Sequence, residues 1–247
     1  MVAMRKDKGF TLVEVLMAVF IGLILLAAVY VSMTSGQRSS VGVERKVAAQ
    51  QDVRAALDVM AMEVSMASYN PNFIPAGVWR EAPIPTATNP CAGVSLNQGW
   101  KGIQEAGPMG ITVEMDILRS NAIGDNPNEI IRYALSGQSV VRNTNCGGDE
   151  TFLGANPLLP AGTNTVRVVN GDLGINNGNG LPAIFRYYNG RQPAQELFPD
   201  TVPTDVVNIR RIDITLGVET EEVDPNTRQR RRMIYSTSVL VRNHVLN

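Results

Sequence analysis

Residues 10 to 33 constrain this chain most, because 20 of these 24 residues are apolar. The interruptions are Thr11, Glu14, Gly22 and Ser32. A helix rises about 1.5 Å per residue, so the run would be about 36 Å long, more than the roughly 30 Å hydrocarbon core of a bilayer. The run therefore predicts a helix that can span a membrane.

Basic residues flank this apolar run unevenly. Those before it are close together, whereas those after it are more spread out: Arg5, Lys6 and Lys8 precede the run, and Arg38, Arg45 and Lys46 follow it. Basic residues near the end of a spanning helix favour the cytoplasmic side. We therefore expect a cytoplasmic N-terminus and an exported body.

An uncleaved signal anchor is the simplest interpretation, and an ordinary secretory signal peptide is the next. The signal peptide fits poorly, because its apolar core is usually about 7 to 15 residues long. The run also lacks a good small-residue cleavage site beyond the loose stretch from Ser32 to Gly36. Neither interpretation explains Glu14, because an ionised carboxylate inside an apolar span costs on the order of a few kcal/mol and no cation lies within the span.

The string Gly9-Phe10-Thr11-Leu12-Val13-Glu14 resembles the class III signal of type IV pilins and pseudopilins. The resemblance implies that a prepilin peptidase cuts between Gly9 and Phe10, and that the new amino group of Phe10 is methylated. It also implies that this amine is neutralised by Glu14 of a neighbouring subunit in a filament core. Such a pair is stronger in an apolar medium than in water, so Glu14 can set the subunit register.

The helix is expected to continue past the apolar run. Val53, Leu57, Met60, Val64 and Ala67 are spaced three or four residues apart and lie on one helical stripe, which we expect to pack on the protein's own body. All 14 prolines lie at or after Pro71, and Asn70-Pro71 is expected to end the helix. The predicted organisation is a leader at 1–9, a transmembrane and filament-core helix at 10–33, an amphipathic continuation at 34–69 and an exported, β-rich globular body at 70–247.

The body is predicted to be an antiparallel β-sheet. Residues 70–127 are expected to form a long irregular connection with one short strand at Ile111–Ile117. Short apolar segments between turn residues predict the later strands, at Ile130–Leu135, Val140–Val141, Thr165–Val169 and Ala183–Tyr188. The fold class is therefore α+β: a long N-terminal helix, first transmembrane and then amphipathic, packed on an antiparallel sheet as in type IV pilins.

The last strands are expected to form a hairpin, Val206–Glu222 with Arg228–Val241, around a turn at residues 224–227. If Val223 faces Arg228, one face is apolar and the other sets Glu219 opposite Arg232 and Glu221 opposite Arg230. The run Arg228, Arg230, Arg231, Arg232 alone suggests an anion or nucleic acid. The neighbouring acidic residues cancel most of its field, so a charge-paired hairpin is the favoured interpretation.

The remaining reactive residues give few candidate sites. Cys91 and Cys146 are expected to form a disulfide in an oxidising compartment, and His244 is expected at the surface. One histidine and two cysteines cannot build a Cys₄ or Cys₂His₂ zinc site. Residues 171–180 have oxygen ligands but one carboxylate, so a glycine-rich turn is favoured over a calcium site. We expect no metal, no cofactor and no catalytic constellation.

Looser similarities lie at residues 54–58, 67–69, 209–216 and 238–243, which resemble the PilW-type minor pilins and nearly as well the J-type pseudopilins of type II secretion. The resemblance implies a minor pilin that helps to initiate or cap a type IV pilus. Its expected partners are prepilin peptidase, other major and minor pilins and the bacterial inner membrane, and nucleic acid is not expected. The chain would cross that membrane once, with its body in the periplasm, before it joins a pilus. A secretion pseudopilin and a membrane-anchored adhesin remain the alternatives.

Overall fold

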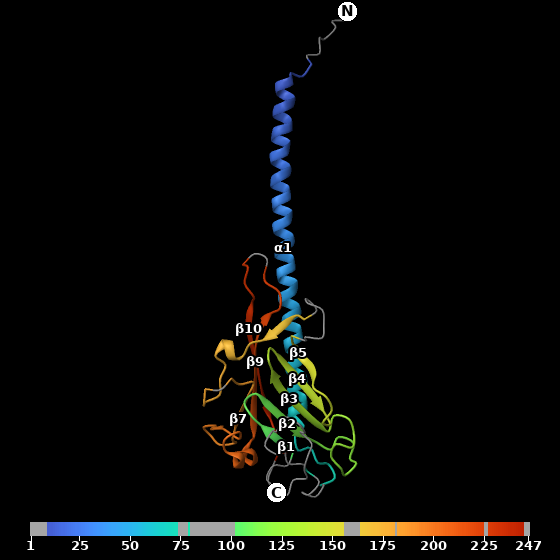
Figure 1. Cartoon of the computed structure of the whole chain (residues 1–247), viewed down its shortest axis with the longest axis vertical. Coiled ribbons are helices and arrows are strands. Elements are labelled where there is room, and N and C mark those ends of the chain that lie inside the picture. The colour runs from blue at the N-terminus through green and yellow to red at the C-terminus, as the bar shows by residue number, and fades with distance from the viewer. Residues whose placement is uncertain are drawn as a thin grey trace, which may run out of the picture.

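The computed structural model describes residues 9–73, 79, 102–155, 164–180, 182–224 and 227–244. One long helix, α1 (Leu12–Ser65), projects from a body made of two antiparallel sheets (Figure 1). The first sheet has the order β1-β2-β3-β4-β5, and the second has the order β10-β9-β7-β8 with β6 also paired to β9. The predicted α+β class is confirmed.

The strands of the first sheet are β1 (Ile103–Ala106), β2 (Gly110–Glu114), β3 (Ile130–Ser136), β4 (Ser139–Thr144) and β5 (Glu150–Gly154). Those of the second sheet are β6 (Val166–Val168), β7 (Phe185–Tyr188), β8 (Glu196–Leu197), β9 (Arg211–Thr220) and β10 (Arg232–Leu240). Short 3₁₀ helices in the described residues include η3 (Gly171–Leu173) and η4 (Pro203–Asn208), which lie between strands.

The two halves of α1 have different surroundings. From Leu12 to Met33 its side chains are exposed, and this half stands clear of the body (Figure 1). In the second half the predicted stripe of Val53, Leu57, Met60 and Val64 is buried and joins the core formed with both sheets, and Ala67 of the same stripe is buried in the turn after α1. Spacing along the sequence thus predicted which side of the helix meets the body.

Met60 offers a direct test of this packing, because it is fully buried while Met62 on the same helix is 58% exposed. We expect Met60→Ala to lower the free energy of unfolding by about 3 kcal/mol, through lost burial and the cavity that remains. Met62→Ala is the matched control and should change it by less than about 0.5 kcal/mol. Denaturant unfolding of the full chain in detergent measures both values, and equal effects would contradict the docked stripe.

The helix ends earlier than Asn70-Pro71 predicted. α1 stops at Ser65, and Ser68 adopts a left-handed conformation with φ 64°. The Ser68 N–H donates to the Glu114 carbonyl at 2.8 Å, so the chain leaves the helix to join the end of β2. This tertiary hydrogen bond, which lies 46 residues along the chain, is not visible in the local sequence.

The sheets differ from the prediction in number and extent. A single sheet was expected, whereas the described residues form two. The expected irregular connection at 70–127 contains the whole β1–β2 hairpin, of which only β2 overlaps the predicted strand at Ile111–Ile117. β5 was not predicted either. The sheets join where the N–H groups of Ile184 and Phe185 donate to the Pro108 carbonyl, at 2.7 and 3.0 Å, and where Val168 N–H donates to the Gln138 carbonyl at 2.9 Å.

The C-terminal hairpin has the predicted register. Arg232 faces Glu219, Met233 faces Val218 and Val239 faces Ile212. Its strands are shorter than expected, because the segment from Val206 to Asn208 belongs to η4 rather than to a strand. Proline at the start of η4 fixes the backbone dihedral φ near a helical value and favours this turn.

His244 is buried, so its expected place at the surface is wrong. Only 4% of the residue is exposed, its Nδ1 lies 2.9 Å from Ser68 Oγ and its Nε2 lies 2.8 Å from the Val206 carbonyl. Both ring nitrogens therefore have partners, which offsets the cost of burying the ring. The contact ties the end of the chain to the turn that follows α1.

The disulfide between Cys91 and Cys146 stays a prediction, because Cys91 lies outside the described residues. We expect a mass 2 Da below that of the dithiol under non-reducing conditions, and a stability loss of about 2 to 4 kcal/mol on reduction. Intact mass with and without reductant and a thiol-blocking reagent measures the pairing. Two modified thiols without reductant would contradict it.

Candidate processing and assembly segment

Gly9 and Phe10 precede the helix as exposed, non-helical chain. Phe10 is 87% exposed, and α1 begins only at Leu12. A Cβ added at Gly9 would meet no atom within 4 Å, and the φ of Gly9 is not in the left-handed region. Nothing in the described fold thus requires glycine here, and the bond between Gly9 and Phe10 is sterically open to a peptidase.

Glu14 closes a capping box with Thr11 at the start of α1. Thr11 is the N-cap, and its Oγ1 accepts a hydrogen bond from the Glu14 N–H at 3.2 Å. The Glu14 carboxylate in turn accepts from the Thr11 N–H at 3.1 Å and from the Thr11 hydroxyl at 3.2 Å. These bonds satisfy two N–H groups that a helix start otherwise leaves open, and they place two donors on the carboxylate.

The sequence did not lead us to expect Thr11 as the hydrogen-bond partner of Glu14. The pattern Thr-x-x-Glu ahead of an apolar run is the usual sequence pattern of a capping box and could have revealed it. The described chain therefore gives Glu14 local partners within its own subunit. A partner in a neighbouring subunit remains a prediction.

The exposed half of α1 is apolar around its whole circumference. Every residue from Leu12 to Met33 is exposed, and only Glu14, Gly22 and Ser32 in this stretch are not apolar. A helix that is apolar on every side needs an apolar environment on every side, such as lipid or a bundle of other helices. By length and composition this segment can cross a membrane.

An ion pair fixes the docked half of α1 to the first sheet. Arg142 donates to Glu63 twice, with Nη2 2.6 Å from Oε1 and Nε 3.2 Å from Oε2, and the Tyr133 hydroxyl also donates to Glu63. Burial and the neighbouring Glu63 carboxylate raise the pKa of Tyr133 above its ordinary value, so Tyr133 remains a hydrogen-bond donor. This bidentate contact adds a specific polar link to the apolar packing that holds α1 on the body.

Residues 4–30 match the family model of the prokaryotic N-terminal methylation motif. The chain carries a type IV pilin-like signal. The matched segment covers the exposed glycine and phenylalanine, the capping box and most of the apolar half of α1. No curated protein and no solved structure gives a significant match to the chain.

The motif indicates a type IV pilin-like or pseudopilin-like protein, a structural rather than an enzymatic class. The apolar half of α1 and the motif together fit a single-pass membrane anchor. The motif also implies processing by prepilin peptidase and assembly with other pilins.

The other candidate sites are placed as follows. In the part of the chain that the structure describes, no group of three or more His, Cys, Asp or Glu side chains could hold a metal ion. Residues 171–180 form η3 and a turn in which Gly174 takes a left-handed φ of 67°. The leading segment 1–8, with its basic residues Arg5, Lys6 and Lys8, lies outside the described residues.

Proposed function

We propose that the chain is a minor pilin, a low-abundance subunit that takes part in starting or capping a type IV pilus. The observation that carries the proposal is the methylation motif at residues 4–30, placed at the free end of a helix whose other half is locked into a β-rich body. The exposed half could pass from lipid into a bundle of like helices without any change in the body.

The proposed sequence of events has three steps. The chain is first held in the bacterial inner membrane with its N-terminus cytoplasmic and its body periplasmic. Prepilin peptidase then cuts between Gly9 and Phe10, and the amino group of Phe10 is methylated. The mature helix finally joins other pilins, with Glu14 facing the Phe10 amine of a neighbour.

A pseudopilin of a type II secretion system is the second candidate, because the same motif and the same division of α1 would serve it. Deletion of the gene separates the two. A minor pilin predicts loss of surface pili and twitching with normal secretion, whereas a pseudopilin predicts loss of exoprotein secretion with pili intact.

A membrane-anchored adhesin predicts a different dependence on processing. Its binding would survive a block of cleavage, because the anchor and the body are both retained. Cell-surface binding by an uncleaved variant would support the adhesin and contradict the minor pilin.

A further inference from the structure

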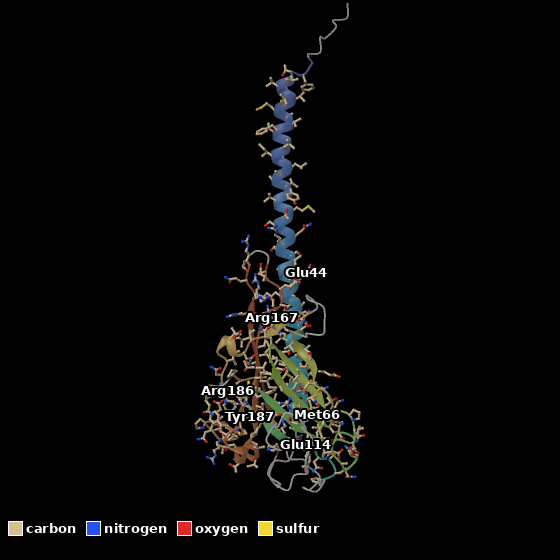
Figure 2. The ribbon with its side chains drawn as sticks, viewed as in Figure 1. Glu44, Met66, Glu114, Arg167, Arg186 and Tyr187 are labelled. Atoms are coloured by element: carbon tan, nitrogen blue, oxygen red, sulfur yellow. The ribbon has the colours of Figure 1, made fainter. Side chains whose placement is uncertain are left out.

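The β9–β10 hairpin is the described part of the body that reaches farthest along α1 toward its apolar half (Figure 1). The Arg45 side chain pairs with Glu222, and its Nη1 lies 3.5 Å from the Val223 carbonyl. A Cβ at Gly42 would lie 3.6 Å from Asp224 Oδ2, in ordinary contact. Figure 2 shows Glu44 at this level of the helix, where the body begins. The hairpin end therefore lies against α1 just below the exposed segment.

The helix fixes the height of the hairpin above a bilayer. Arg38 follows the last residue of the apolar run, Met33, by about 7.5 Å of helix, and Gly42 follows it by about 14 Å. Headgroups extend roughly 5 to 8 Å beyond the hydrocarbon core. Arg38 thus lies at headgroup level, and the hairpin lies within about a Debye length of that layer.

Seven basic residues gather at this level, and we call them the basic collar: Arg38, Arg45 and Lys46 of α1, and Arg228, Arg230, Arg231 and Arg232 of the hairpin. On the helix, Arg38, Gly42 and Arg45 are spaced four and three residues apart, so they share the face that meets the hairpin. The full chain carries a net charge of −1, so the collar is a local concentration of charge and not a general property of the protein.

Four members of the collar already have acidic partners. Arg231 lies 2.6 Å from Asp224, Arg232 lies 3.4 Å from Glu219, and Arg45 pairs with Glu222. Arg230 lies beside Glu221 as predicted, and its Nε donates to the Glu221 carbonyl at 3.0 Å, but the Glu221 carboxylate pairs with Arg167 at 2.8 Å and Arg230 is 4.0 Å from Glu219. The charge-paired hairpin is thus found, with one partner changed.

Three members of the collar are left without an ion pair in the described part of the chain, namely Arg38, Lys46 and Arg228. All three are exposed. Ion pairs already occupy the acidic residues of the hairpin, and one exposed carboxylate, Glu44, lies at the same level of α1. Three unpaired basic residues against one unpaired acidic residue leave the collar with a net positive charge.

A groove of about 490 Å³ opens beside Lys46, between α1 and the start of β10. Lys46 and Gln50 line its helix side, and residues 231–235 line its strand side. Its walls combine cationic groups with the apolar side chain of Ile234, which is 57% exposed. Such a mixture suits a group that is anionic at one end and apolar at the other.

We propose that the basic collar binds the anionic headgroups of membrane phospholipids and so holds the body against the bilayer surface. Arg38, Lys46 and Arg228 supply the attraction, and the paired arginines keep the hairpin in shape. The proposal rests on the membrane anchor of the proposed function, but not on whether the protein serves a pilus or a secretion system. A lipid surface fits better than nucleic acid because the collar faces the side from which the apolar helix leaves the body.

The test uses the full chain in lipid nanodiscs that are either zwitterionic or contain about one third phosphatidylglycerol. Amide hydrogen exchange is followed in the hairpin residues 221–224 and 227–232. We expect the exchange rate there to be roughly five-fold lower in the anionic discs. Each basic residue near an anionic lipid surface is attracted to it, and a hairpin held against the headgroups would expose its amide groups to water less often. The variant Arg38→Gln/Lys46→Gln/Arg228→Gln should lose this difference.

The matched control is Arg119→Gln/Arg191→Gln/Arg242→Gln. It removes the same charge from exposed arginines that lie at the opposite end of the body from the turn of the β9–β10 hairpin. It should keep the protection.

Equal exchange in both kinds of disc would overturn the collar, as would protection that survives in the collar variant. Protection by inorganic phosphate in zwitterionic discs, or by duplex DNA but not by anionic discs, would assign the collar to another ligand. A chain that enters neither kind of disc would instead contradict the anchor itself.

Discussion

Gly9→Arg is expected to abolish the mature form of the protein while leaving its fold intact. The structure separates these two effects, because a side chain at Gly9 meets no atom within 4 Å and the residue lies outside α1. The loss would therefore reflect the peptidase, whose site must accommodate the residue before the cut bond. Intact mass of the purified chain should show residues 1–9 retained in essentially every molecule.

Gly148→Arg is the matched control for this substitution. A Cβ at Gly148 also meets no atom within 4 Å, and the residue is exposed in the body, so the same side chain is added far from the cut bond. This variant should be processed as the original chain is. Normal processing of the Gly9 variant would contradict cleavage between Gly9 and Phe10.

Substitutions at Glu14 are expected to have the second large effect, the loss of incorporation into filaments. Glu14→Ala removes both the charge and the capping box, so it cannot separate the two roles. Glu14→Gln keeps an acceptor for the Thr11 N–H but removes the charge. If the charge pairs with the Phe10 amine of a neighbour, Glu14→Gln should fail to assemble although its helix starts normally.

Thr11→Ala completes the comparison, because it removes the cap and keeps the carboxylate. Loss of an N-cap costs about 1 kcal/mol, a small effect for a helix 54 residues long. We therefore expect this variant to assemble, as measured by the amount in sheared surface filaments relative to the membrane fraction. Assembly of Glu14→Gln together with failure of Thr11→Ala would show that helix capping, not charge pairing, is what matters.

The parts of the fold that follow a local period could be predicted from sequence. The stripe at Val53, Leu57, Met60 and Val64 repeats with the period of a helix, and its burial followed. The β9–β10 register followed from alternation along both strands, because a slip of one residue would have turned the apolar face outward.

The parts that depend on distant partners could not be predicted in this way. β1 has the sequence Ile-Gln-Glu-Ala, which lacks alternation, and pairing with β2 makes it a strand. His244 is buried because the end of β10 returns to the turn after α1, where Ser68 and the Val206 carbonyl meet its ring. Neither arrangement leaves a trace in the neighbouring sequence.

Most of the candidate site could be predicted from sequence, because its residues lie within six consecutive positions, 9 to 14. Gly9, Phe10 and Glu14 stand out because a glycine, an aromatic residue and a lone acid precede or interrupt an otherwise apolar run. The basic collar was harder to recognise, because it joins residues from the helix and from a hairpin about 190 positions later.

The mass of the N-terminal peptide of the mature protein tests the central claim most directly. Protein purified from cells that contain prepilin peptidase should begin at Phe10 with one added methyl group, and protein from cells without the peptidase should retain residues 1–9. An N-terminus at residue 1 or 2 in both cells, or a cut near Ser32 to Gly36, would contradict the pilin-like account.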